Sequence, residues 1–161
     1  MNEIILLLGE STIVGIYTTV LTFVIAFIPS FFIPSTHKNV LHFIFFFFTL
    51  GFIKHFLGFY LGLQSFYCNY GIECSKKDDN NNLEARRPSF FENLLEGIVF
   101  VLFGLIFKNI FSMLLKYGNN IYLISFFTGF FLHFISDMVG VHAFFCKYYC
   151  FPTVYRFKTN L

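Results

Sequence analysis

Residues 121–145 read IYLISFFTGFFLHFISDMVGVHAFF, and the only formally charged side chain in this run belongs to Asp137. An α-helix rises about 1.5 Å per residue and a hydrocarbon core is about 30 Å thick, so about 20 apolar residues cross a membrane. Three more stretches are long enough, and the predicted spans are Ile13–Ile33, Val40–Leu63, Leu94–Leu115 and Ile121–Phe145. The predicted fold is therefore an all-α membrane protein with four transmembrane helices.

The composition of the chain supports this class. Of its 161 residues, 57% are hydrophobic and 12% are charged, whereas soluble domains are about 25% charged. The apolar runs lack the alternation of a membrane β-barrel, and lipid requires a backbone that satisfies its own hydrogen bonds, which favours helices. A net charge of +2 leaves no extended cationic face, so no nucleic-acid partner is expected. The expected partners are the lipid bilayer, further copies of the chain or other membrane proteins.

Short polar connections divide the chain into four segments. Residues 1–68 are predicted to form a first two-span hairpin and residues 89–146 a second one. The polar segment 69–88 between them includes the run KKDDNNN and is expected to be disordered. It leads into Ser89 and Glu92, a capping-box pair that predicts a helix start. Residues 147–161 mix basic and aromatic side chains, as expected of a tail at the headgroup level.

The two hairpins resemble each other in sequence. A shift of 78 residues superimposes Gly51 on Gly129, His55 on His133, Gly62 on Gly140 and Cys68 on Cys146. We interpret this as a parallel repeat, with two copies related by a pseudo-twofold axis along the membrane normal.

Small residues and one histidine recur at helical spacing on spans two and four. Residues spaced this way share one helix face, and small residues let membrane helices approach closely. The pattern predicts that spans two and four pack in parallel through a Gly/His seam that contains Gly51, His55, Gly58 and Gly62 on span two and Gly129, His133, Ser136 and Gly140 on span four.

Four polar side chains are expected near the middle of the membrane: Lys54, His55, His133 and Asp137. Charges in a span are costly and should find partners, so Lys54 and Asp137 are predicted to neutralise each other. The favoured interpretation is structural: these side chains form polar contacts inside the membrane that fix which helices pair. A proton relay, a transport pocket, a metal site and bis-histidine haem ligation are the alternatives.

Three other polar side chains are assigned to the membrane surfaces. His142 is interpreted as an interfacial side chain, and Glu96 and Lys108 as an acid and a base near opposite interfaces.

The four cysteines all follow the ends of spans two and four, on the same side as both termini: Cys68, Cys74, Cys146 and Cys150. Most basic residues also lie on that side, and the positive-inside rule places it in the cytosol. Cytosolic cysteines should be reduced, so free thiols or palmitoylation are expected, with a zinc site as an alternative. The opposite orientation would instead favour two lumenal disulfides.

The segment from Gly129 to Cys146 resembles a motif in small multi-span membrane proteins of large nucleocytoplasmic DNA viruses. The resemblance implies a protein of the virion's internal membrane or of host membranes such as the endoplasmic reticulum. No hydrolase, phosphate-binding, zinc-protease or selectivity-filter motif occurs, so no enzyme, cofactor or metal is expected. The predicted function is a structural or assembly role in a membrane. The alternatives are a small transporter or proton-conducting bundle and a haem- or thiol-based redox protein.

Overall fold

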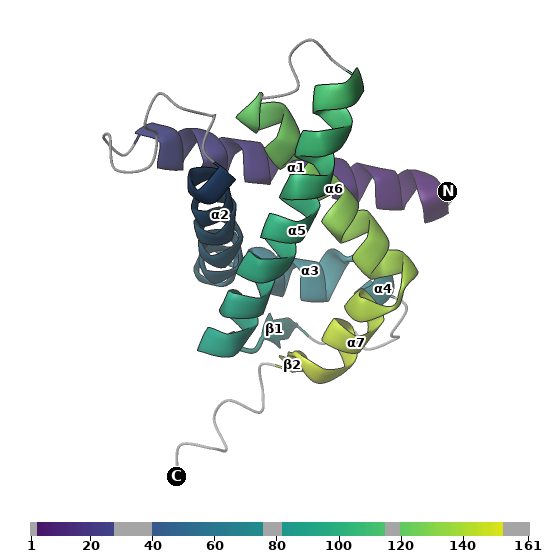
Figure 1. Cartoon of the computed structure of the whole chain (residues 1–161). Coiled ribbons are helices and arrows are strands. Elements are labelled where there is room, and N and C mark those ends of the chain that lie inside the picture. Colours follow the sequence, from purple (N-terminus) through teal and green to yellow (C-terminus); the bar gives the residue numbers. More distant parts are fainter. Residues whose placement is uncertain (1–2, 28–39, 76–81, 115–119, 153–161) are drawn as a thin grey trace.

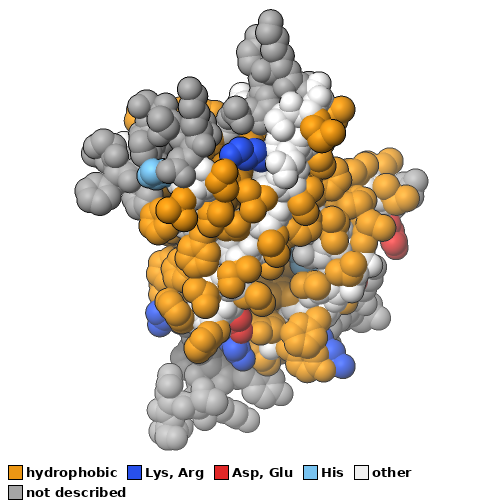
Figure 2. Space-filling model, viewed as in Figure 1, with side chains coloured by type: hydrophobic (Ala, Val, Ile, Leu, Met, Phe, Trp, Pro, Cys, Tyr) orange, Lys and Arg blue, Asp and Glu red, His pale blue; other side chains and the backbone are white. Residues whose placement is uncertain are grey.

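The computed structural model describes residues 3–27, 40–75, 82–114 and 120–152. Four long helices occupy most of the described chain: α1 (Glu3–Phe27), α2 (Val40–Tyr60), α5 (Phe90–Leu114) and α6 (Ile121–Met138). All four are long and apolar enough to cross a membrane, as predicted. Hydrophobic side chains cover most of the face shown in Figure 2, which is the surface that lipid requires.

Shorter elements gather at one end of the long helices (Figure 1). They are α3 (Leu63–Tyr70), α4 (Ile72–Ser75), β1 (Leu83–Ala85), α7 (Val141–Tyr148) and β2 (Cys150–Pro152). The strands pair antiparallel, with Leu83 opposite Pro152 and Ala85 opposite Cys150. The predicted disordered segment 69–88 therefore contains a helical turn and a strand. Most of its KKDDNNN run, residues 76–81, lies outside the described residues, as does most of the predicted tail.

Two glycines end the predicted second and fourth spans earlier than expected. Gly62 has φ 75° and Gly140 has φ 80°, a left-handed backbone that glycine adopts without a Cβ clash. Each interrupts the apolar run and precedes an eight-residue helix, α3 or α7. The run from Ile121 to Phe145 is therefore two helices rather than one span.

The first span begins earlier than predicted. Helix α1 starts at Glu3 and includes Glu10, where the prediction began at Ile13. The Glu10 carboxylate is inside the fold because it has partners there: Oε1 accepts a hydrogen bond from the Ile72 backbone N–H at 3.0 Å. A paired carboxylate is tolerated in a setting where an unpaired one is not.

The helices pair differently from the expected hairpins. Helix α1 packs mainly against α6, and α2 packs mainly against α5, while α5 also contacts α6. Phenylalanine side chains of α2 and α5 fill the space that glycines leave on the facing helix. Phe47 lies against Gly104, Phe48 against Gly97, and Phe100 against Gly51. Because lipid is as apolar as these side chains, close packing of this kind is what holds membrane helices together.

The predicted capping box at the start of α5 is confirmed. The Ser89 N–H donates to Glu92 Oε2 at 2.7 Å, and the Glu92 N–H donates to Ser89 Oγ at 3.3 Å. Glu92 also accepts a hydrogen bond from the Tyr149 hydroxyl at 2.8 Å and pairs with Arg86 at 3.3 Å. The helix cap therefore joins α5 to the ends of α7 and β1.

Candidate functional site

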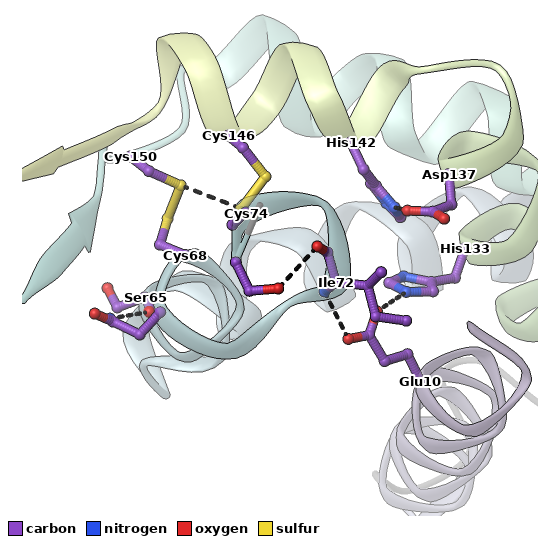
Figure 3. The surroundings of a disulfide bond; sticks show 12 residues. Glu10, Ser65, Cys68, Ile72, Cys74, His133, Asp137, His142, Cys146 and Cys150 are labelled. Atoms are coloured by element: carbon purple, nitrogen blue, oxygen red, sulfur yellow. Dashed lines mark hydrogen bonds and ion pairs between the residues drawn. A yellow bond between two sulfur atoms is a disulfide. The ribbon is translucent and has the colours of Figure 1, made fainter. Parts of the chain in front are cut away.

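The four cysteines form two disulfides that join the first half of the chain to the second (Figure 3). Cys68 of α3 is bonded to Cys150 of β2, and Cys74 of α4 is bonded to Cys146 of α7. The bonds are close together, with 3.9 Å between the sulfurs of Cys74 and Cys150. The expectation of free or palmitoylated thiols is therefore wrong. Helix ends distant in sequence meet here, and spacing along the chain does not show this.

The predicted intramembrane polar cluster is divided into two groups. In the first, on α2 and α5, Lys54 Nζ lies 3.0 Å from Glu96 Oε1. One residue further along α2, His55 Nδ1 lies 2.8 Å from Oδ1 of the buried Asn93. The backbone carbonyl of Lys54 also accepts a hydrogen bond from the Tyr17 hydroxyl of α1 at 3.2 Å. This group ties α2 to α5 and to α1.

The second group lies between α1, α6 and α7, next to the disulfides (Figure 3). His133 Nε2 lies 3.4 Å from Glu10 Oε2, and His142 Nδ1 lies 3.2 Å from Asp137 Oδ1. The two imidazole rings are 4.3 Å apart between centroids, and the Tyr67 ring lies 5.6 Å from that of His133. Two carboxylate–histidine pairs thus face each other across a small distance.

Lys54 and Asp137 have different partners, which corrects the prediction that they neutralise each other. Lys54 pairs with Glu96, and Asp137 pairs with His142. The reason is the helix pairing: α2 packs on α5, so the acid facing Lys54 comes from α5. Glu96 and His142, which were assigned to the membrane surfaces, belong to these two groups. Lys108 lies 4.5 Å from the centre of the Phe43 ring.

The predicted Gly/His seam is distributed over two interfaces. A Cβ on Gly51 would lie 2.6 Å from Phe100 Cβ of α5, and a Cβ on Gly129 would meet the Thr18 side chain of α1. Side chains at Gly58, Gly62 and Gly140 would meet nothing within 4 Å. Ser136 is half-buried on the same helix as Gly129. The small-residue face of α2 therefore packs on α5, and the small-residue face of α6 packs on α1.

A row of buried hydroxyls in the α1/α6 interface was not recognised in the sequence. Five fully buried side chains lie on the two buried helix faces: Ser11, Thr18 and Thr22 of α1, and Ser125 and Thr128 of α6. Thr18 and Thr22 donate to backbone carbonyls of their own helix. The Ser11, Ser125 and Thr128 oxygens have no hydrogen-bond partner among the described atoms. The spacing of Ser11, Gly15, Thr18 and Thr22, which places them on one helix face, was the available signal.

Burial sets the protonation of two side chains in the second group that lie outside the spans. Desolvation, the positive charge of His133 when protonated and the charge of Lys54 lower the pKa of His142 to about 3. His142 is therefore neutral near pH 7, and its Nδ1–H donates to the Asp137 carboxylate. Desolvation, with the nearby charges of Glu10 and Asp137, raises the pKa of Tyr67 above its usual value. The Tyr67 hydroxyl stays protonated.

Neither the chemistry of the site nor comparison with other proteins supplies a known activity. Among the described residues, no three His, Cys, Asp or Glu side chains are grouped in a way that would hold a metal ion. The chain matches no protein-family model, no curated protein and no solved structure.

Proposed function

We propose that this multi-pass membrane protein has a structural or assembly role, in which its polar groups fasten helices together. The observation that carries this proposal is that polar and charged side chains of the spans pair across two helix interfaces. Lys54 faces Glu96 between α2 and α5, and His133 faces Glu10 between α1 and α6. A charge that is paired in this way selects which helices associate, because any other partner would leave it uncompensated in lipid.

The proposed architecture is an intertwined duplication, in which the helices of each copy pack mainly on helices of the other copy. Three observations support it. Helix α1 packs on α6 and α5 on α2, so the first helix of each copy contacts the second helix of the other. The short helices α3 and α7 start at Leu63 and Val141, which are 78 residues apart, the same as the shift of the sequence repeat. Each disulfide joins the first half of the chain to the second.

The proposed orientation places the disulfides in an oxidising compartment, opposite to the orientation that the basic residues predict. Disulfides persist in the lumen of the endoplasmic reticulum or outside the cell and are rare in the cytosol. Of the membranes that the viral resemblance implies, the endoplasmic reticulum offers such a lumen. A protease added to sealed vesicles of known sidedness tests this. We expect cleavage in the segment 76–82 only from the lumenal side, and cleavage from the cytosolic side alone would reverse the orientation.

The structural role is tested on protein purified in mild detergent. We expect an absorbance spectrum without a cofactor band, metal content at the level of a blank preparation, and disulfides that do not exchange with a reduced peptide. Cross-linking in the native membrane should capture a complex of defined stoichiometry with a second copy or another membrane protein. A stoichiometric haem or metal, or disulfide transfer to the peptide, would replace the structural role by a redox one.

A further inference from the structure

The interface between α1 and α6 contains buried hydroxyls without a hydrogen-bond partner among the described atoms. Serine and threonine are common in close-packed membrane-helix interfaces, where their hydroxyls normally hydrogen-bond to a neighbouring helix or to their own backbone. Here Ser11, Ser125 and Thr128 are fully buried, and their hydroxyl oxygens have no hydrogen-bond partner among the described atoms. Buried polar groups in proteins are nearly always satisfied by protein or by ordered water, so each unsatisfied one calls for an explanation.

The hydroxyls follow one another along the interface. Near the disulfides, Glu10 of α1 pairs with His133 of α6, and further along, the rings of Phe23 and Tyr122 are 6.4 Å apart. These two contacts show that α1 and α6 run antiparallel. The hydroxyls lie between them, so they extend away from the Glu10–His133 pair toward the opposite end of α6. The span from Ser11 to Thr22 alone covers about 16 Å at 1.5 Å per residue, about half of a hydrocarbon core.

One end of this row is the Glu10–His133 pair. Glu10 keeps 22% of its side-chain surface exposed, while His133 is 9% exposed. The charged and titratable groups around the pair come from four other residues: His142, Asp137 and Tyr67, shown above, and Glu73 of α4, whose charge also acts on Tyr67. A carboxylate and an imidazole are side chains that proteins use to accept and donate protons.

We propose that the Glu10–His133 pair and the buried hydroxyls of α1 and α6 form a path for protons across the membrane. The hydroxyls bind water molecules in the interface, and together these oxygens connect the pair to the far side. At each step an oxygen accepts a proton on a lone pair and releases its own to the next oxygen. The net change is one proton removed from one aqueous side and one delivered to the other. This activity is independent of the structural role proposed above.

Proton flux into liposomes tests the path. The full chain is reconstituted with a pH-sensitive dye inside, and a potassium gradient with valinomycin drives protons while balancing charge. We expect wild-type protein to acidify the lumen faster than protein-free liposomes do. Glu10→Gln, Thr128→Val and Ser125→Ala should each remove most of this flux. The matched control is Thr12→Val, which makes the same change on the exposed side of α1 and should leave the flux intact.

A second variant separates loss of the path from loss of the fold. Thr128→Ser keeps the hydroxyl and should restore flux, and both disulfides in every variant are checked on a non-reducing gel. Wild-type flux equal to that of protein-free liposomes would overturn the proposal. Unchanged flux in Thr128→Val with both disulfides formed would also overturn it, and would identify the hydroxyls as packing groups only.

Discussion

Lys54 on α2 and Glu96 on α5 lie 3.0 Å apart, from Nζ to Oε1, and this contact joins the second and third spans of the chain. The Lys54 ammonium also lies 5.1 Å from the centre of the Phe100 ring, whose side chain fills the space at Gly51. The ion pair therefore lies beside a closely packed region of the α2/α5 interface. It stands beside the hydrogen-bonded His55 and Asn93 on the same two helices.

Removal of either charge should destabilise the protein more than removal of both. Lys54→Met leaves Glu96 without its partner, and Glu96→Leu leaves Lys54 without its own, at a cost of about 3 kcal/mol each for a largely buried pair. The double variant should recover much of that loss. Unfolding in detergent, followed by circular dichroism, measures the three effects. The control is a double variant that combines Lys54→Met with Asp137→Leu. Their effects on the free energy of unfolding should add, because the two residues have different partners.

The glycines of α2 should differ sharply in their tolerance of a side chain. A Cβ at Gly51 would lie 2.6 Å from Phe100 Cβ and 2.9 Å from the Glu96 carbonyl oxygen, so Gly51→Ala should lose about 1 to 3 kcal/mol. Gly58→Ala meets open space and should gain up to about 1 kcal/mol from helix propensity. Thermal unfolding of the two variants checks this. Equal destabilisation by both would mean that a surface packs on Gly58 as well.

Loss of one disulfide should weaken the protein without scrambling the other. Cys68→Ser with Cys150→Ser opens the bond that closes the longer loop and should cost about 2 to 5 kcal/mol. Cys74 and Cys146 should still pair, because α4 and α7 remain in contact. Peptide mapping under non-reducing conditions identifies the bonds. A Cys74–Cys146 peptide that disappears in this variant would show that the two bonds form only together.

Acid should weaken the fold through His142. Its folded pKa of about 3 lies below the ordinary value of about 6.5, so the unfolded chain binds a proton that the folded chain excludes. Stability should therefore fall as pH drops below about 6.5, by up to about 1.4 kcal/mol per pH unit. His142→Gln should reduce this slope between pH 7 and 5, whereas His42→Gln, at an exposed position of α2, serves as the control. Unfolding midpoints of both variants are measured across that range. A pH dependence of stability in His142→Gln equal to that of the wild type would show that the His142 pKa is the same in the folded and the unfolded chain.

Local features of the sequence determined the number of long helices and several of their ends. The start of α6 at Ile121 coincides with the predicted span start, and the capping box Ser89–Glu92 lies at the start of α5 as expected. These predictions hold because span length and helix capping depend on residues within a few turns of one another. The left-handed breaks at Gly62 and Gly140 were not predicted, since small residues at helical spacing look the same whether a glycine packs against another helix or ends its own.

Only the tertiary structure decided which surfaces meet. Periodicity marked Gly51 and Gly129 as packing positions, but lipid is as apolar as any helix face, so nothing local distinguishes α5 from α6 as the partner of α2. The same limit applies to charge: Lys54 needed an acid, and helix pairing selected Glu96 over Asp137. Four cysteines permit three pairings, and the meeting of α3 with β2 and of α4 with α7 selected one. Partner choice follows from contacts between residues far apart in the chain, which a short window of sequence does not contain. Lys54 and Glu96 are 42 residues apart, and Glu10 and His133 are 123 residues apart.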